Sequence, residues 1–461
     1  MDVDAEEHRL PFPIERCRLS GWGRTPSSLC DVATPRDSDE VVQLLARGEG
    51  RGVIPRGLGR SYGDAGQRAG GLVLDMTRLD LIGPVDRDTG LVTVGGGVSI
   101  DQLLRDVLPQ GGFVPVTPGT RNVTIGGAIA ADIHGKNHHR DGSFCRHVTA
   151  MTLVTPTGVH EVTPDNDPDL FWATAGGMGL TGIVVGATIR LLPVESSWVT
   201  VDTHRFARLE DLMHEMEAHD HDYRYSVAWV DCNAGGSRLG RSILTRGDHA
   251  GREQVARSSS RPCHQELASP SVKIPRQLPK GLLNVASVTA FNELWFRKAP
   301  KMRLGELQHI GAFFHPLDGV SDWNLLYGPN GFLQYQFAVG DLFGDVVREA
   351  IDLVCAARVP SFVSVLKRFG PGDDGPLSFP IAGWTLALDF PVGPAALPAL
   401  VDALDEIVLN AGGRVYLAKD SRARPEHVHK MYPRIPELQS VRDRIDPDRV
   451  LQSDLSRRLD I

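Results

Sequence analysis

Short apolar runs alternate with helix-like segments over residues 31–192. Gly71–Met76 and Leu91–Val94 are apolar enough to predict buried strands. Ser99 and Gln102 have the spacing of a capping box, and the helix that they begin carries Leu103, Leu104, Val107 and Leu108. The pattern therefore predicts many short elements rather than a few long ones.

Two further helices and a hairpin are predicted in the same region. An Asp37-x-x-Glu40 capping pattern precedes a helix whose apolar face consists of Val41, Val42, Leu44 and Leu45. Met151–Thr155 and Val159–Val162 form a hairpin around a Pro-Thr-Gly turn. A short helix begins at Asp169, and the strand Ile183–Leu192 follows. Because the elements lack a regular βαβ rhythm, the fold is predicted to be α+β.

The pattern of apolar and polar residues changes near Trp198. Strand-like segments now recur between helical runs, which predicts an antiparallel sheet with helices on one face. The strands are expected at 225–230, 332–339, 361–366 and 384–390, and the helices at 346–357 and 397–410. Ala250–Pro279 has no clear period and is predicted to be a mobile loop or lid. Gly412–Asp420 is predicted to be one more strand.

Composition narrows the class of protein. The chain has 461 residues, enough for two sizeable domains, and a net charge of −8, which argues against general nucleic-acid binding. Its six cysteines form no C-x-x-C pair, so reduced structural thiols are expected. No run approaches the roughly 18 apolar residues of a membrane span. The acidic N-terminus lacks the apolar core of a signal peptide, so by its own sequence the chain is expected to be cytoplasmic.

Two glycine-rich loops carry the first chemical signal. Arg56–Asp64 (RGLGRSYGD) and Pro118–Gly127 (PGTRNVTIGG) each follow an apolar strand-like run, and the second continues into Asp132–Gly135. Glycines permit positive φ and let backbone N–H groups approach a phosphate. The pair of loops predicts a cradle for FAD, whereas one loop alone is typical of an ordinary surface turn.

Two other interpretations of the first loop are less consistent with its context. Gly57, Gly59 and Gly63 depart from G-x-G-x-x-G by one position, and the polar segment 64–71 that follows does not open a helix. The same loop matches G-x-S-x-G, but a hydrolase nucleophile also needs a helix directly after the turn. Neither the nicotinamide fingerprint nor the serine-hydrolase motif is therefore favoured.

Together with the 169–182 block and the elements at Tyr432-Pro433 and Asp446-Pro447, these loops resemble the vanillyl-alcohol-oxidase-type (PCMH-type) FAD family. The resemblance implies a two-domain α+β fold in which an antiparallel-sheet substrate domain caps the flavin. It places an FAD-binding domain at 1–194, a substrate-binding domain at 195–411 with the mobile loop 250–279, and a C-terminal return to the FAD domain at 412–461.

Five segments are further similar to mycobacterial oxidases of a polyprenyl-phosphate ribose. They are Gly21–Thr25, Ala131–His139, Gly331–Phe337, Leu377–Ile381 and Ala418–Arg422. This resemblance implies FAD-dependent oxidation of the C2′ hydroxyl of decaprenylphosphoryl-β-D-ribose to a ketone, the first half of epimerisation to the arabinose form for cell-wall arabinan. It also implies an NADH-dependent short-chain reductase as partner and a membrane-associated site in the cell envelope, on the periplasmic side. Two alternatives are an oxidase of soluble sugar alcohols or aldonolactones, and a flavin-binding scaffold that only recruits the reductase.

The resemblance carries a set of flavin contacts onto this chain. FAD is expected to be non-covalent, because Arg60 stands where several oxidases of this fold have a flavin-linked histidine; His134 is the remaining candidate for attachment. The expected cofactor-binding residues are Arg56, Gly57, Leu58, Gly59, Arg60, Ser61, Tyr62, Gly119, Thr120, Thr124, Gly126, Gly127, Ile133, His134, Asn137, Gly182, Val184 and Tyr416.

Catalysis is assigned to Lys419, Gln336 and His134. Lys419 is the leading candidate for handling the hydroxyl proton, which requires a lowered pKa; Lys367 is either its cationic neighbour or a ligand of the substrate phosphate. Gln334 and Gln336 are two apart on a strand and therefore face one side. The expected substrate-binding residues are Tyr62, Gln334, Gln336, Lys367, Thr385, Ala387 and Lys419.

Two departures from the related enzymes concern the substrate side. Ala387 replaces a cysteine that nitroaromatic inhibitors attack, so covalent inhibition by that route is expected to fail. Phe314 replaces a frequent tyrosine and is expected to remove a hydroxyl from the substrate-side wall.

Two clusters remain open to more than one interpretation. His134, His138 and His139 have metal-ligand spacing, but no accompanying carboxylate motif, so no metal is expected. The segment 295–303 mixes aromatic residues with four cations. It is compatible with peripheral membrane association through lipid phosphates or anionic headgroups, and equally with a solvated basic turn.

Overall fold

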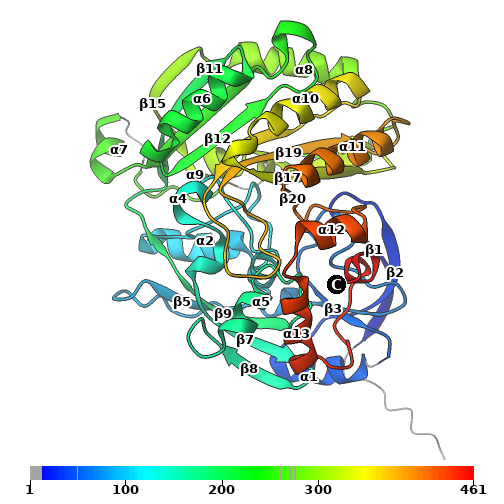
Figure 1. Cartoon of the computed structure of the whole chain (residues 1–461). Helices are drawn as coiled ribbons and strands as arrows, with labels where there is room; N and C mark the ends of the chain where they lie inside the picture. Colours follow the sequence, from blue (N-terminus) through cyan, green and yellow to red (C-terminus); the bar gives the residue numbers. More distant parts are fainter. Residues whose placement is uncertain (1–12, 49, 259–261, 269–271, 275–276) are drawn as a thin grey trace, which may run out of the picture.

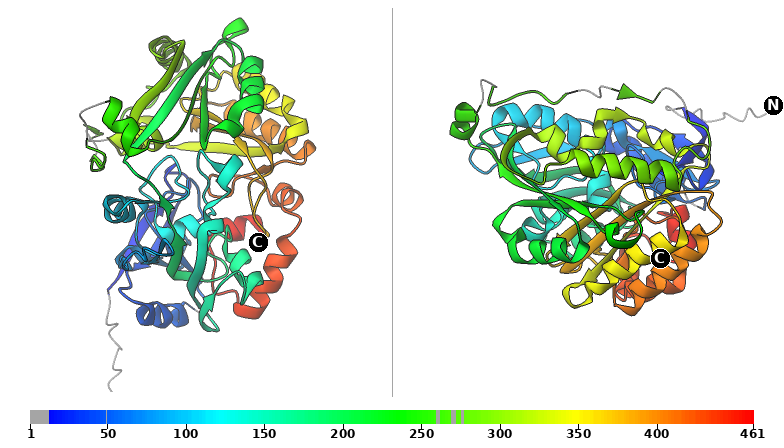
Figure 2. Two further views of the ribbon diagram at one scale, coloured as in Figure 1. Left: turned by 90° about the vertical axis from the view of Figure 1, so that its left-hand side faces the viewer. Right: turned by 90° about the horizontal axis from the view of Figure 1, so that it is seen from above.

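The computed structural model describes residues 13–48, 50–258, 262–268, 272–274 and 277–461. Residues 1–12 of the predicted FAD-binding domain therefore lie outside the described residues. The chain forms two lobes stacked on one another, and both the N-terminal third and the C-terminal helices belong to the lower lobe of Figure 1. A second view, at right angles to the first, shows the same division (Figure 2).

The first lobe contains two four-stranded sheets. One has the order β1-β2-β4-β3, in which β1 and β2 are antiparallel while β4 runs parallel to β2 and β3. Its strands are β1 (Ile14–Ser20), β2 (Ser27–Ala33), β3 (Val53–Arg56) and β4 (Leu72–Asp75). The other sheet, β5-β9-β7-β8, is antiparallel and comprises β5 (Leu91–Gly95), β7 (Val148–Thr155), β8 (Gly158–Val162) and β9 (Ile183–Arg190). The mixed architecture confirms the predicted α+β class.

The helices of this lobe begin where the caps predict. Asp37 accepts a hydrogen bond from the Glu40 N–H at the start of α1 (Ser38–Arg47), and the Ser99–Gln102 capping box is present at α2 (Ile100–Val107). Val42 was wrongly placed on the apolar face of α1, because its side chain is 39% exposed. The remaining short elements of the lobe are α3 (Ile125–Ala130), α4 (His138–Asp141), α5 (Pro168–Thr174), β6 (Gly112–Phe113) and β10 (Leu192–Pro193).

The second lobe is built on one antiparallel eight-stranded sheet, as predicted. Its order is β15-β11-β13-β12-β18-β19-β17-β20. The strands are β11 (Trp198–Phe206), β12 (Tyr225–Val230), β13 (Ser242–His249), β15 (Met302–His309), β17 (Phe332–Gly340), β18 (Ser364–Phe369), β19 (Gly383–Pro391) and β20 (Arg414–Val415). Helices α6 (Leu209–His219), α10 (Asp345–Ala357) and α11 (Leu397–Asn410) cover one face of this sheet (Figure 1). The second lobe also contains α8 (Val285–Lys298) and α9 (Ile310–Phe314).

Two segments differ from their predictions. Within 250–279, residues Arg252–Ser258 form helix α7, whose Val255 packs on Trp198, and β14 (Val272–Lys273) pairs with β16 (Val320–Ser321). The segment predicted to be a mobile loop or lid therefore contains short regular elements, and its mobility stays a prediction; residues 259–261, 269–271 and 275–276 lie outside the described residues. The strand predicted at 412–420 is limited to β20, because the N–H groups of Lys419 and Asp420 donate to the Tyr416 carbonyl and close a turn.

The C-terminal segment returns to the first lobe. Val53 of β3 donates to the Val450 carbonyl at 2.8 Å and accepts from the Gln452 N–H at 2.9 Å. Of the C-terminal helices α12 (Pro425–Met431), α13 (Ile435–Ile445) and α14 (Asp454–Leu459), α12 contacts α11, β20 and α14, and α13 contacts α5; Figure 1 shows them in red and orange at the C-terminal end of the chain. Arg458 of α14 contacts both Asp64 carboxylate oxygens and one oxygen of Asp420, each at 2.8 Å. This ion-pair cluster joins the C-terminus to the first glycine loop.

Replacing Arg458 with methionine is expected to destabilise the protein by about 3–5 kcal/mol, because two buried carboxylates lose their common counter-charge. The measurement is urea unfolding of the purified holoprotein. Arg457→Met is the matched control, since Arg457 is an exposed arginine of the same helix. Equal urea concentrations at the midpoint of unfolding for the two variants would contradict this account of the ion-pair cluster.

Candidate active site

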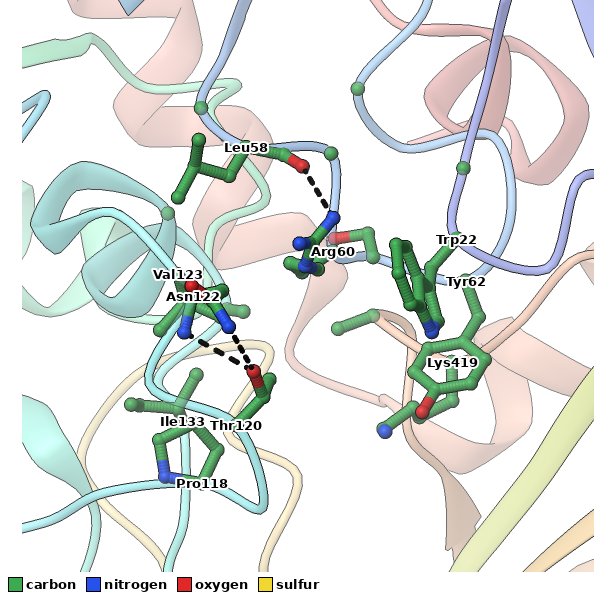
Figure 3. A pocket seen from close by; sticks show the side chains of 18 of the residues that line it. Trp22, Leu58, Arg60, Tyr62, Pro118, Thr120, Asn122, Val123, Ile133 and Lys419 are labelled. Atoms are coloured by element: carbon green, nitrogen blue, oxygen red, sulfur yellow. Dashed lines mark hydrogen bonds between the residues drawn. The ribbon is translucent and has the colours of Figure 1, made fainter. Parts of the chain in front are cut away.

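One cavity of about 500 Å³ collects most of the predicted site residues from both lobes. Figure 3 shows the two glycine loops on opposite sides of it, with Arg60 and Tyr62 across from Thr120 and Ile133. All predicted flavin contacts except Asn137 line this cavity. So do Gln334, Gln336, Lys367, Ala387 and Lys419 from the substrate set. Residues separated by more than 300 positions are thus brought to one site.

Two glycines allow the loops to approach each other. A Cβ on Gly57 would lie 2.0 Å from Thr124 Oγ1, and Gly59 has a φ of +64°. Thr124 in turn caps α3, because its hydroxyl accepts a hydrogen bond from the Gly127 N–H at 3.2 Å. The first loop therefore docks against the cap of the second, and backbone rather than side chains forms this wall of the cavity.

Two arginines of the first loop have different surroundings. Arg56 donates to the carbonyls of Ser20 and Gly66, so its guanidinium braces the loop. Arg60 lies with its guanidinium carbon 4.0 Å from the ring centroid of Trp22. Burial lowers the pKa of both groups, yet both stay cationic at neutral pH. Arg60, which Figure 3 shows facing the cavity, can therefore meet an anionic group there.

His134 supplies a ring nitrogen that has no protein partner. The side chain is buried, and its pKa lies well below the usual value, chiefly because of burial and then because of Lys367. Gln336 Nε2 lies 2.9 Å from His134 Nε2 and 3.1 Å from Thr385 Oγ1. Since an amide nitrogen only donates, His134 Nε2 accepts and the proton resides on Nδ1. That N–H is buried without a hydrogen-bond partner, in a residue that lines the cavity.

These features match the requirements of a flavin dinucleotide. The glycine walls accept a bulky phosphate group at the backbone, and the orphaned Nδ1–H of His134 is a donor for a bound molecule. Arg60 and Trp22 add a cation and an aromatic face. The residues present therefore fit FAD.

The two glutamines lie on the same face of β17 and project toward the cavity, as predicted. Gln334 is paired across the sheet with Asp389, and Gln336 with Ala387. Gln334 Nε2 donates to Asp389 Oδ1, so its carbonyl oxygen is directed away from that carboxylate. A hydrogen bond also joins Gln334 to Tyr62. The amides are therefore held by the protein rather than free to rotate in solvent.

Lys419 lies at the same end of the cavity, in the turn after β20. Its Nζ is 3.8 Å from the ring centroid of Tyr62. Desolvation lowers the pKa of Lys419 to about 7, with Asp389 opposing this effect and Lys367 adding to it. An amine with this pKa is largely uncharged just above neutrality, which suits a general base.

Lys367 occupies the neighbouring position on β18. Burial lowers its pKa to about 8, and its Nζ donates to the Gly135 carbonyl at 3.4 Å. A third lysine, Lys136, was not identified from the sequence. Its Nζ contacts the Phe313 carbonyl, and burial lowers its pKa to about 7. The substrate end of the cavity thus has a cluster of partly desolvated amines close by.

Three predicted contacts belong elsewhere. Asn137 donates to the Pro115 carbonyl and to Asp141, outside the cavity lining. Thr385 accepts from Gln336 beneath the cavity surface and so supports that amide. Phe314 packs between Phe113 and Tyr225 in the core, so it is not part of a substrate-side wall.

The three neighbouring histidines have separate partners. His138 contacts Ser143 Oγ and accepts from the Gly370 N–H, while His139 contacts the Tyr223 carbonyl. Over the described part of the chain, no group of three or more His, Cys, Asp or Glu side chains has a metal-binding arrangement. The arrangement instead assigns His134 alone to the cavity.

Sequence reasoning also missed Asp389 and Trp22. Asp389 is the single carboxylate in the apolar strand 384–390, and its side chain is fully buried. A lone acid in an apolar strand is a usable signal, but its position opposite Gln334 required the register. Trp22 lies in the Gly21–Thr25 segment, where its contact with Arg60 depends on a long-range approach.

Comparison with known proteins identifies the family. Residues 31–163 match the FAD binding domain family, and residues 394–459 match the D-arabinono-1,4-lactone oxidase family. The chain is 44% identical to the decaprenylphosphoryl-beta-D-ribose oxidase of Mycolicibacterium smegmatis, over 98% of this chain and 99% of that protein. It is 24% identical to the L-gulono-1,4-lactone dehydrogenase of Mycobacterium tuberculosis, over 95% and 98% of the two chains. This protein therefore belongs to the vanillyl-alcohol-oxidase-type FAD-dependent oxidoreductases, in the family of the decaprenylphosphoryl-beta-D-ribose oxidase.

Proposed function

We propose that this protein oxidises the C2′ hydroxyl of decaprenylphosphoryl-β-D-ribose to the 2′-ketone, the first half of epimerisation to the arabinose form used for cell-wall arabinan. One observation supports this proposal above the others. Lys419, Gln334 and Gln336 converge at one end of the cavity whose other walls are the two glycine loops. The close relationship to an oxidase of that name supports the same substrate class. When bound, FAD supplies the hydride-accepting chemistry.

The protein's own residues provide position and proton transfer. Lys419 Nζ receives the proton of the substrate hydroxyl, because its lowered pKa leaves a free amine near neutral pH. Gln334 and Gln336 orient the sugar hydroxyls with amides that Asp389 and Thr385 hold in place. Lys367 lowers the pKa of Lys419 and is a second cation within reach of a substrate phosphate.

Non-covalent attachment of FAD is part of the proposal. Arg60, which cannot form the flavin bond of a histidine, occupies the first loop and lies on Trp22. His134 is held through Nε2 by Gln336, which leaves Nδ1 as a hydrogen-bond donor. Acid precipitation is therefore expected to release the yellow cofactor into the supernatant.

The proposed partners are a membrane surface and an NADH-dependent short-chain reductase that reduces the ketone. None of the helices formed by the described residues is long and apolar enough to cross a membrane. Support for membrane contact comes from α8 and the adjoining β15, which together expose apolar and basic side chains. This apolar–basic surface consists of Phe291, Leu294, Trp295, Arg297, Lys298, Lys301, Met302, Arg303 and Leu304. Such a surface suits anionic headgroups on the periplasmic side of the envelope.

Replacing Arg297 and Lys298 with glutamine is expected to weaken binding to anionic vesicles roughly 30-fold, at about 1 kcal/mol for each cation removed. The measurement is co-sedimentation with vesicles containing anionic lipid, at low and at physiological salt. Arg87→Gln with Lys430→Gln is the charge-matched control, since both residues are exposed and lie outside this surface. Equal binding by the two double variants would contradict membrane contact at α8.

The substrate assignment is tested by anaerobic reduction of the bound flavin. Loss of absorbance near roughly 450 nm, set by the flavin itself, is followed after adding a short-prenyl phosphoribose analogue. Bleaching by the analogue supports the proposal. Absence of bleaching by the analogue, with bleaching by a free pentitol or an aldonolactone, overturns it.

A soluble aldonolactone or sugar-alcohol substrate is the second candidate. The match of residues 394–459 to the D-arabinono-1,4-lactone oxidase family favours it. That segment, about one seventh of the chain, includes α11, β20, Lys419 and the C-terminal return, and it leaves most strands of the large sheet outside the match. Both the phosphoribose oxidase and the lactone dehydrogenase align over nearly the whole chain, but the identity is 44% for the first and 24% for the second, which is why the lipid-linked substrate is preferred.

A further inference from the structure

Beneath the floor of the cavity lies a carboxylate whose charge the proposed reaction does not yet use. We infer that Asp389 is a positioning residue, which fixes the Gln334 amide and stabilises the protonated form of Lys419, while Lys367 destabilises that form. This inference rests on the proposed function, in which Lys419 receives the hydroxyl proton. It assigns opposite electrostatic roles to two residues on adjacent strands, β18 and β19.

The contacts of Asp389 establish its position. Its side chain is fully buried on β19, and its register partner is Gln334 of β17. Oδ1 accepts from Gln334 Nε2, and Oδ2 accepts from the Tyr327 hydroxyl at 3.2 Å. An ionised carboxylate only accepts, so it imposes one orientation on the Gln334 amide. The carbonyl oxygen of Gln334 is then directed toward the cavity, where it can accept from a sugar hydroxyl.

A buried carboxylate also requires a positive counterpart. Two neutral donors, Gln334 and Tyr327, do not balance a full charge. The cation that acts on Asp389 is Lys419, from the turn after β20. Burial raises the pKa of Asp389 to about 6, while Lys419 and the two hydrogen bonds oppose that rise. The Asp389 carboxylate and the Lys419 amine therefore act on each other electrostatically, each favouring the charged form of the other.

Lys419 is influenced from several elements at once. Burial lowers the pKa of Lys419, Asp389 on β19 raises it and Lys367 on β18 lowers it further, and together these effects bring it to about 7. The Tyr62 ring faces Nζ from the first glycine loop, and His134 beside it is neutral, because its own pKa lies well below the usual value. Asp389 is thus the negative group of this environment and Lys367 the competing cation.

The two neighbours have predictable and opposite consequences. A carboxylate favours an ammonium ion, whereas a second ammonium disfavours it. Removing the charge of Asp389 makes Lys419 a weaker base that is deprotonated at lower pH. Removing the charge of Lys367 makes Lys419 a stronger base that is deprotonated only at higher pH. A residue with a purely structural role would lower the rate without moving this midpoint.

The experiment measures the protonation of Lys419 in the holoenzyme without requiring turnover. Acetic anhydride acylates only the free amine, so labelling of the Lys419 peptide is followed by mass spectrometry across pH. Asp389→Asn is expected to move the midpoint down by about one pH unit, and Lys367→Met to move it up by about one unit. Asp405→Asn is the matched control, because it removes another buried carboxylate, one bound to Tyr335 on the opposite face of the sheet.

Unchanged midpoints in D389N and K367M would overturn the inference, as would shifts of the same sign. If D389N does not fold, K367M alone still tests the opposing charge, and Tyr327→Phe tests the network with the Asp389 charge retained. Tyr327→Phe is expected to keep the wild-type midpoint far more closely than D389N. The acid limb of the rate profile is recorded in parallel. Labelling midpoints that shift while this limb does not would leave the inference standing and refute Lys419 as the base.

Discussion

Replacing Lys419 with methionine is expected to slow substrate-dependent flavin reduction by about 10²–10⁴-fold, the usual contribution of a general base. Methionine keeps much of the side-chain length but cannot accept the hydroxyl proton. FAD binding is expected to persist, because the glycine loops and the Arg60–Trp22 contact do not depend on the amine. The rate is measured by anaerobic stopped-flow absorbance at saturating substrate.

Lys430→Met provides the matched control, because Lys430 is an exposed lysine of α12. The wild type is expected to lose rate as pH falls through about 7, where Lys419 becomes protonated, while the methionine variant lacks this limb. A Lys419→Met enzyme that retains the wild-type rate would favour another base. Unchanged output of the whole pathway would favour the scaffold alternative.

Replacing Gly57 with alanine is expected to weaken FAD binding roughly 5- to 150-fold. The added Cβ would lie 2.0 Å from Thr124 Oγ1, which caps α3 beside the cavity. Overpacking of this kind costs about 1–3 kcal/mol. Either the first loop moves away from Thr124, or Thr124 moves and α3 loses its N-cap. Both changes alter the cavity wall to which the two loops contribute.

The measurement is titration of the deflavinated variant with FAD, followed by flavin fluorescence. Gly235→Ala is the control, because a Cβ there meets no neighbouring atom within 4 Å. Wild-type affinity in Gly57→Ala would show that the loop tolerates the displacement of Thr124. Loss of affinity in both variants would indicate a general effect on folding.

Much of the fold followed from local rules. The Asp37 cap, the Ser99–Gln102 capping box and the antiparallel sheet of the second lobe depend on neighbouring residues or on strand period, both readable in the chain. One failure has a local cause, and another depends on a long-range contact. The 412–420 segment has strand-like composition, but the Tyr416 carbonyl accepts hydrogen bonds from the N–H groups of Lys419 and Asp420, which closes a turn. Helix α7 forms where its Val255 packs on Trp198 of β11, which lies much earlier in the chain.

The candidate site, like the fold, was predicted in part from the sequence and missed in part. Motif spacing and family resemblance identified the glycine loops, His134 and Lys419, which meet in one cavity. Asp389 escaped notice because its importance arises from pairing with Gln334 across the sheet, which a linear sequence does not display. Phe314 and Asn137 were assigned to walls from which tertiary packing removes them. Resemblance transfers a residue's place in the chain more reliably than the direction of its side chain.

The return of residues 412–461 to the first lobe has a consequence for how this protein is made. When translation reaches residue 411, seven of the eight strands of the large sheet have been synthesised, but Lys419 and the Arg458 clasp on Asp64 have not. The glycine loops are therefore synthesised early, whereas Lys419 and Arg458, which contact the first of these loops, are synthesised last. Because domains fold as units during synthesis, both lobes are still incomplete at this stage: the second lacks β20 and the first lacks its C-terminal helices. Loading of FAD is thus a late step of biosynthesis, after most of the polypeptide has left the ribosome.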